Sequence, residues 1–198
     1  MKTESKIMSF QNAHIHYLCC GEGEKTAVFL HGKSFSAATW EETGCIVPIA
    51  AAGYRVICID LPGYGKSEKN DLPSESLLEP LLRDMGIETM VITAPSFSGW
   101  YAFPFLFACP EKIKGFVGIA PRGIRKYRDS LHRIAAPVLA MWGENDDLVP
   151  IHHADILLQS VPNGRKTVLP GGSHAPYLSD PEWFRKEMGD FLSECFGK

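Results

Sequence analysis

Short apolar runs alternate with segments of helical spacing along most of the chain. The runs show little internal alternation of apolar and polar residues, which is typical of strands buried on both faces. They occupy residues 26–30, 54–59, 88–93, 113–120 and 137–142. Helical periodicity covers residues 38–51, 74–85, 98–109, 153–160 and 181–196. Buried strands that alternate with helices predict a mostly parallel sheet with helices on both faces.

The two ends of the chain add strands of another kind. Residues 7–10 and 14–18 flank a short polar turn and predict an antiparallel hairpin at the N-terminal edge of the sheet. Residues 165–169 predict a last strand between the two C-terminal helices. A length of 198 residues suits one domain with a full-sized core, and no linker or repeat divides it. We therefore expect a single domain over residues 1–198.

A serine stands at a sharp strand-to-helix turn after the third run, within Ala94–Gly99 (APSFSG). A serine at the apex of such a turn is the nucleophile elbow of serine hydrolases. The turn is so tight that small residues must lie two before and two or three after the serine. Ser96 meets this condition, whereas a turn centred on Ser98 would place Trp100 there. Ser96 is the predicted nucleophile, and a serine-rich helix cap is the structural alternative.

A serine hydroxyl needs a base, and the chain supplies a histidine and a carboxylate in the required order. His174 lies in a glycine-rich loop after the last strand, and Asp146 follows the fifth run. Carboxyl ends of parallel strands meet at one edge of a sheet. The order Ser, Asp, His therefore predicts a triad with His174 as base and Asp146 as orienting acid. Asp147 is the alternative acid, and a solvated loop histidine is the structural alternative for His174.

An acyl-transfer enzyme also needs donors for the developing oxyanion. We expect one donor in the backbone N–H of Phe97, directly after the predicted nucleophile. The other is expected in the loop after the first parallel strand, from the N–H of Lys33, with Ser34 as the alternative. His31 in this loop is expected to hydrogen-bond the loop rather than to take part in the chemistry.

Charge and motif spacing exclude several other functions. The formal net charge of −3 gives no overall positive field for nucleic acid or an anionic membrane. The segment Asp60–Ser67 ends like a phosphate-binding loop, but no helix follows it, which excludes an NTPase. His152 and His153 are neighbours without a third ligand nearby, so no metal site is predicted.

The remaining composition indicates an ordinary intracellular domain. The six cysteines form no C-x-x-C pair, and we expect buried or idle reduced thiols. No apolar run approaches the length of a membrane span, and no apolar leader follows Met1–Lys6. A cytoplasmic location is the default expectation.

Together these features resemble the α/β-hydrolase superfamily over nearly the whole chain, and within it the α/β-hydrolase-domain-containing protein 14 family. The shared residues are His31-Gly32 with Phe35, Ser36 and Trp40, the run Asp60–Ser67, Pro95–Gly99 with Pro104–Leu106, and Ser173–Ala175 with Tyr177 and Leu178. The Pro-Ser-x-Ser-Gly elbow, in place of the commoner Gly-x-Ser-x-Gly, is the most specific of them. The resemblance implies a lidless ester-cleaving hydrolase. It also implies kinship with a protein-lysine deacetylase that passes acetyl to coenzyme A.

The surroundings of the site are predicted from the same segments. We expect Phe35, Trp100, Arg122 and Tyr177 to wall the substrate pocket, with plain core packing as the alternative. Residues 121–136 offer room for one short helix but not for a cap domain, so the site should be open and prefer short acyl chains.

The segment 121–136 is also basic. Its cations are Arg122, Arg125, Lys126, Arg128 and Arg133, against Asp129 alone. A solvated helix face is the plainer interpretation. The sharper one is a rim that attracts phosphate, as in coenzyme A acting as acyl acceptor.

The sequence thus predicts an α/β-hydrolase fold and a serine hydrolase that forms an acyl-serine intermediate. Its substrates would be short acyl esters or amides, on small molecules or on acylated protein lysines. Two other functions remain as alternatives: a non-catalytic interaction module on the same fold, and peroxidation of short acids.

Overall fold

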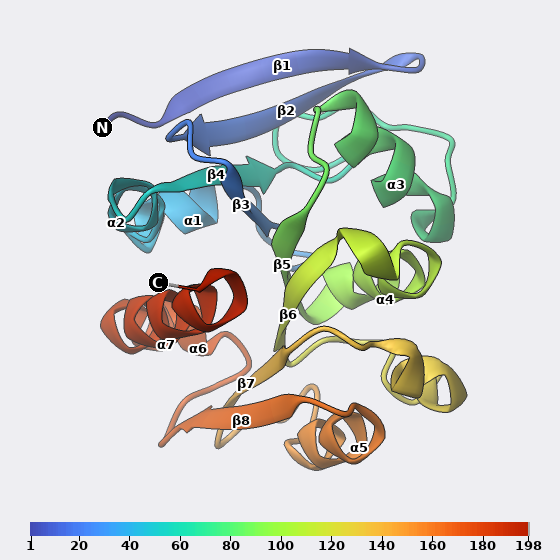
Figure 1. Cartoon of the computed structure of the whole chain (residues 1–198), viewed down its shortest axis with the longest axis vertical. Coiled ribbons are helices and arrows are strands. Elements are labelled where there is room, and N and C mark those ends of the chain that lie inside the picture. The colour runs from blue at the N-terminus through green and yellow to red at the C-terminus, as the bar shows by residue number, and fades with distance from the viewer. Residues whose placement is uncertain (198) are drawn as a thin grey trace.

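The computed structural model describes residues 1–197, which build one eight-stranded sheet (Figure 1). The strand order across it is β1-β2-β4-β3-β5-β6-β7-β8. The strands are β1 (Glu4–Phe10), β2 (Ala13–Cys20), β3 (Lys25–Phe29), β4 (Tyr54–Ile59), β5 (Met90–Pro95), β6 (Ile113–Ile119), β7 (Val138–Gly143) and β8 (Gly164–Leu169). Strands β3 to β8 pair in parallel, whereas β2 is antiparallel to both β1 and β4. The predicted α/β-hydrolase sheet with its N-terminal antiparallel hairpin is confirmed.

Helices cover both faces of the sheet. They are α1 (Ala38–Glu42), α2 (Ile46–Ala51), α3 (Ser74–Asp84), α4 (Gly99–Ala108), α5 (His152–Ser160), α6 (Pro176–Ser179) and α7 (Pro181–Phe196), with 3₁₀ turns η1 (Ser96–Ser98), η2 (Pro110–Lys112) and η3 (Arg128–Arg133). Helices α3, α4 and α5 pack on one face, and α1, α2, α6 and α7 on the other (Figure 1).

Each inner strand therefore has two buried faces. In β3, Val28 belongs to the core under α3 and α4, while its neighbour Phe29 belongs to the core under α1 and α7. Successive side chains of a strand point to opposite faces. A strand between two helix layers must then be apolar at every position, which explains the unbroken apolar runs in the sequence.

The segment 38–51 is two short helices, not the single helix that its spacing predicts. Gly44 takes a φ of +65° and its N–H donates to the Glu41 carbonyl, which ends α1. In a continuous helix Pro48 would lack an N–H for the preceding turn and its ring would press on that carbonyl. In α2 it is the third residue, where an N–H has no partner within the helix.

The connection from β6 to β7 also differs from the prediction. Residues 121–136 hold the 3₁₀ turn η3 in place of an α-helix. Ser130 N–H donates to the Tyr127 carbonyl and Ile134 N–H to the Leu131 carbonyl, both spanning three residues. The basic residues of this segment therefore do not share one helix face. The connection is still too short for a cap, and the described chain has none.

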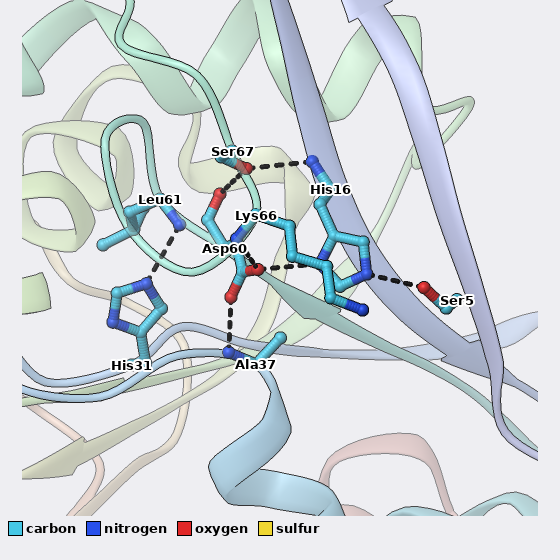
Figure 2. A network of polar contacts seen from close by, with 8 residues as sticks. All are labelled: Ser5, His16, His31, Ala37, Asp60, Leu61, Lys66 and Ser67. Atoms are coloured by element: carbon cyan, nitrogen blue, oxygen red, sulfur yellow. Dashed lines mark hydrogen bonds and ion pairs between the residues drawn. The ribbon is translucent and has the colours of Figure 1, made fainter.

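A buried carboxylate, Asp60, ties the N-terminal hairpin to the loops after β3 and β4 (Figure 2). Its Oδ2 lies 2.7 Å from Nδ1 of His16 on β2 and accepts the Lys66 N–H at 2.9 Å. Its Oδ1 accepts the Ala37 N–H at 2.6 Å. The turn after β4 is thus built around one acceptor that satisfies donors from three parts of the chain.

No helix within residues 1–197 is long and apolar enough to cross a membrane.

The structure predicts a large loss of stability for Asp60→Ala. The substitution leaves the donors of His16, Ala37 and Lys66 without their acceptor in a buried site, which costs about 3 kcal/mol. Urea unfolding followed by circular dichroism measures the free energy of unfolding. Asp71→Ala is the matched control, because that side chain is exposed, and it should change stability by less than about 0.5 kcal/mol. Equal stability of the two variants would contradict this account.

Candidate active site

The chain reverses direction at Ser96, between β5 and the start of α4. Ser96 has a φ of +47°, a conformation that costs a non-glycine residue free energy and is found mostly where function requires it. Its carbonyl accepts the N–H of Arg122 at 2.8 Å, which ties the loop after β6 to the turn. The turn presents the Ser96 hydroxyl at the carboxyl edge of the sheet.

Small residues around Ser96 are needed because neighbouring backbone comes very close. A Cβ added to Gly99 would collide with the carbonyl oxygen of Arg122. Ala94 is fully buried beneath the turn. Ser98 is buried too, and its hydroxyl donates to the Pro95 carbonyl at 2.9 Å. Ser98 is therefore part of the turn itself, and its hydroxyl is already hydrogen-bonded within it.

Ser96, His174 and Asp146 form a continuous chain of hydrogen bonds. Nε2 of His174 lies 2.8 Å from Oγ of Ser96, and Nδ1 lies 2.8 Å from Oδ2 of Asp146. A carboxylate only accepts, so Nδ1 carries the proton and Nε2 is free to accept from the serine hydroxyl. The imidazole is 21% exposed and the Asp146 side chain is fully buried. The neighbouring Asp147, the alternative acid, is exposed and lies outside this chain of contacts.

The loop that carries Asp146 holds the carboxylate ionised. Its Oδ1 accepts the N–H groups of Leu148 and Val149, both at 2.9 Å. Burial raises the pKa of Asp146, but the hydrogen bonds from His174, Val149 and Leu148 outweigh burial and hold that pKa below its usual range. A carboxylate that stays charged keeps the His174 ring in one orientation and one tautomer.

The loops that carry the acid and the base are fastened to each other. Glu144 N–H donates to the Leu169 carbonyl at 3.0 Å, and Asn145 N–H donates to the Gly172 carbonyl at 2.8 Å. These bonds continue the β7–β8 pairing past the ends of both strands. The side chains of Asp146 and His174 are thereby brought together although 28 positions separate them.

The loop after β3 is held by His31. The Leu61 N–H donates to Nε2 of His31 at 3.0 Å, which fixes the proton on Nδ1, 2.8 Å from the Gly32 carbonyl. Burial lowers the pKa of His31, against the Gly32 carbonyl and the charge of Asp60, so the ring is held neutral. His31 therefore bonds the loop, as its position in the sequence suggests, and Figure 2 shows it beside the Asp60 network.

A cavity of about 260 Å³, here called the Ser96 pocket, opens between these loops. It is lined by Gly32, Lys33, Ser34, Phe35, Pro95, Ser96, Phe97, Arg122, Leu148, His174, Ala175 and Tyr177. The structure thus brings three of the four predicted wall residues, and both predicted oxyanion donors, to the candidate nucleophile. Tyr177 is almost fully buried, with its ring 6.3 Å from that of Phe35.

The structure places Trp100 outside the Ser96 pocket, unlike the other three predicted wall residues. It is the second residue of α4, and its ring packs edge-on against Tyr127 with the centroids 6.2 Å apart. The side chain lines a neighbouring cavity instead. Sequence reasoning missed Leu148, a 63% exposed apolar side chain that lines both cavities. Its only signal is its place two residues after Asp146.

The cysteines offer no activated thiol beside this site. Burial raises the pKa of Cys45 to about 11 and that of Cys58 well above its ordinary value. Burial also raises the pKa of Cys195 to about 12. These three thiols stay protonated near neutral pH and are poor nucleophiles. Within residues 1–197, no group of three or more histidine, cysteine or acidic side chains could hold a metal ion.

The chain is similar to proteins of one known family. No protein-family model matches the chain. The protein ABHD14A of Danio rerio is 38% identical over 173 residues, which are 84% of this chain and 64% of that protein. The "Putative protein-lysine deacylase ABHD14B" of Rattus norvegicus is 33% identical over 177 residues, 85% of this chain and 83% of that protein. The chain belongs to the ABHD14 family. It spans less than two thirds of the Danio rerio protein.

Solved structures show the same fold at low sequence identity. A "predicted CIB-like hydrolase" from Thermoplasma acidophilum superposes with a TM-score of 0.93 at 20% identity, covering 98% of this chain and 99% of that one. The carboxylesterase CesB of Bacillus subtilis superposes with a TM-score of 0.83 at 18% identity, covering 98% and 93%. At such identities the likeness establishes the α/β-hydrolase fold that this member of the ABHD14 family shares.

Proposed function

We propose that this protein is a serine hydrolase that cleaves short-chain acyl esters or amides through an acyl-Ser96 intermediate. The observation that carries the proposal is the chain of hydrogen bonds from Ser96 through His174 to Asp146. Ser96 and His174 also line a pocket of about 260 Å³ that can hold a short acyl group. The ABHD14B relative, named for protein-lysine deacylation, supports acylated lysine as one substrate class.

In the first half of the reaction Ser96 attacks the substrate carbonyl. Oγ forms a bond to the carbonyl carbon while its proton passes to Nε2 of His174, 2.8 Å away. The imidazolium is stabilised by the Asp146 carboxylate. His174 then gives the proton to the departing alcohol or amine, and the acyl group remains on Ser96.

Backbone amides at two loops are the donors for the oxyanion. Phe97 is the second residue of the 3₁₀ turn η1, and amides at the start of a helix have no partner inside it. Lys33 contributes its N–H from the loop that His31 and Asp60 hold in place. Donors fixed before the reaction stabilise the tetrahedral intermediate without reorganisation.

In the second half the acyl-serine is released. His174 takes a proton from an attacking water, the acid leaves, and Oγ of Ser96 regains its proton. A thiol such as that of coenzyme A can replace water as acceptor, because the pocket is not covered by a cap. The result is then a thioester in place of a free acid.

The alternative of a non-catalytic interaction module fits the geometry less well. A binding surface gains nothing from a serine at positive φ, an imidazole hydrogen-bonded to its hydroxyl and a carboxylate held ionised behind that imidazole. The positive φ of Ser96 and the burial of the Asp146 carboxylate each oppose an intrinsic preference of the chain. Peroxidation of short acids would use the same serine. Its product is a peracid, whereas hydrolysis gives a free acid, so product analysis distinguishes the two reactions.

Substitution of the two serines tests the nucleophile. Ser96→Ala should abolish labelling by a fluorophosphonate probe and lower kcat on a small acetyl ester by roughly 10⁶-fold, because the attacking oxygen is lost. Ser98→Ala should keep labelling and most of the activity, because the Ser98 hydroxyl only bonds the Pro95 carbonyl. Thermal unfolding confirms that both variants fold. Activity that survives in Ser96→Ala and vanishes in Ser98→Ala would refute the assignment.

Substitution of the two neighbouring aspartates tests the acid. Asp146→Asn should lower kcat by roughly 10³- to 10⁴-fold, because an amide no longer fixes the tautomer of His174. Asp147→Asn removes an exposed charge outside the hydrogen-bonded chain, and kcat should stay within about twofold. Steady-state kinetics on the same acetyl ester compare them. A greater loss in Asp147→Asn than in Asp146→Asn would move the acid by one residue.

The size of the Ser96 pocket predicts a limit on acyl length. A cavity of about 260 Å³ without a cap cannot enclose a long chain, so kcat/KM should fall from acetyl and butyryl to octanoyl esters of one alcohol. Methylenes beyond the cavity gain none of the roughly 0.8 kcal/mol that each buried methylene supplies. A chain too long for the cavity also displaces the carbonyl from Ser96, which lowers kcat/KM. A steady rise of kcat/KM with chain length would contradict the short-chain assignment.

A further inference from the structure

A second cavity of about 190 Å³ adjoins the Ser96 pocket. We call it the Arg125 pocket. Its main side chains are Trp100, Arg122, Arg125, Lys126, Leu148 and His153. Arg122 and Leu148 line both cavities, so a molecule whose carbonyl lies at Ser96 reaches the Arg125 pocket by passing these two side chains.

The charged side chains that line the two cavities are all cationic. Lys33 and Arg122 line the Ser96 pocket, and Arg122, Arg125 and Lys126 line the Arg125 pocket; no aspartate or glutamate lines either. The Asp146 carboxylate lies behind the imidazole and is occupied by it and by two backbone amides. No carboxylate on the walls of the Ser96 pocket or the Arg125 pocket therefore neutralises these cations.

The contacts of these cations leave their charge available. Glu75 reaches Lys126 at 3.5 Å, but both side chains are about half exposed, where an ion pair is weak. Arg125 Nη2 lies 3.1 Å from Nε2 of His152, and no carboxylate pairs with Arg125 in the described chain. Within the described chain, the Arg122 guanidinium has no hydrogen-bond acceptor.

Two aromatic rings, those of Trp100 and Tyr127, hold the cation of Lys126 in place. The Lys126 ammonium lies 5.4 Å from the centroid of the Trp100 ring and 5.0 Å from that of Tyr127. A cation over two aromatic rings loses part of its freedom before any ligand binds. Burial lowers the pKa of His153, and the charges of His152 and Arg125 lower it further against the charge of Asp146.

We propose that the Arg125 pocket binds an anionic group, a carboxylate or a phosphate, carried by the substrate whose carbonyl lies at Ser96. The inference deepens the proposed hydrolase function and rests on it. The carbonyl of an ester or amide carries an acyl part on one side and a leaving group on the other. Either of them can extend past Arg122 from the Ser96 pocket into the Arg125 pocket, so either can carry the anion. Guanidinium and ammonium donors bind such groups with charge-assisted hydrogen bonds, and Trp100 covers the adjoining apolar surface.

Calorimetry on the intact protein tests binding without turnover. The probes are phenyl phosphate and benzoate, with benzyl alcohol as the neutral comparison, at 20 mM salt. We expect both anions to bind, the alcohol not to bind, and the anion affinity to fall in 1 M salt, where the Debye length shrinks from tens of ångströms to about 3 Å.

Charge-reversal variants locate the binding site. Arg125→Glu with Lys126→Glu should weaken phenyl phosphate binding about tenfold or more. Lys112→Glu with Lys114→Glu is the control, because it makes the same change of net charge. These lysines lie where β6 begins, whereas the Arg125 pocket lies beyond the end of β6. The control should leave binding unchanged. Arg125→Gln with Lys126→Gln, which adds no negative charge, gives a second measurement should the reversal variant fail to fold.

Paired substrates identify the part of the substrate that carries the anion. The acyl arm compares mono(4-nitrophenyl) glutarate with its methyl ester, and the leaving-group arm compares 4-acetoxyphenyl phosphate with 4-methoxyphenyl acetate. In one arm the ratio of kcat/KM, anionic over neutral, should drop about tenfold in the Arg125/Lys126 variants and stay constant in the Lys112/Lys114 control. Because each ratio is compared between variants of one protein, differences in intrinsic ester reactivity cancel.

The outcomes separate this inference from the proposed function. Turnover of the neutral esters without anion binding, or with equal loss in the control variant, overturns the anion site and leaves the hydrolase intact. Binding of phenyl phosphate that the Arg125/Lys126 variants lose, in a protein that cleaves none of the esters, overturns the hydrolase and upholds an anion site. A ratio that does not respond in either arm overturns the claim that the substrate itself carries the anion.

Discussion

The backbone reversal at Ser96 is the constraint on which the site depends. A residue with a φ of +47° at the end of a buried strand is tolerated only where the surrounding chain fixes it. Here the constraints are the Arg122 amide, which donates to the Ser96 carbonyl, and the absence of a side chain at Gly99. Both involve the Arg122 backbone, in the loop after β6. Together they hold the Ser96 hydroxyl at the sheet edge and the Phe97 amide at the start of the following helix.

The other loops must then meet this turn, and each is fastened to its neighbour rather than packed separately. The acid and base loops share backbone hydrogen bonds that prolong β7 and β8. The loop after β3 is fastened to the loop after β4 through His31 and through the carboxylate of Asp60. Asp60 in turn reaches His16 on the antiparallel hairpin, far from the chemistry (Figure 2). The stability of this edge of the sheet and the geometry of the loop after β3 therefore depend on the same contacts.

The features that the sequence predicted are those set by local physical rules. Period and burial predicted the strands, and the small residues around Ser96 predicted which serine stands at the apex. The order of Ser96, Asp146 and His174 predicted contacts over 78 and 28 positions, because parallel strands end at one edge. The features that it did not predict depend on tertiary detail. The break at Gly44 and the 3₁₀ form of residues 128–133 oppose plausible helical spacing, and the direction of the Trp100 ring depends on its packing against Tyr127.

The absence of a cap changes which residues can select a substrate. In a capped hydrolase an inserted domain supplies most of the pocket wall, whereas here the walls come from the loops that build the catalytic geometry. The few side chains of these loops that reach outward, Lys33, Arg122 and Leu148, must then carry selection. Two of the three are cationic in a chain whose formal net charge is −3. A local field opposite in sign to the net charge concentrates anionic ligands at one cleft and not over the whole surface. For the hydrolase proposed above, these cations add selection by charge to a pocket that no cap encloses.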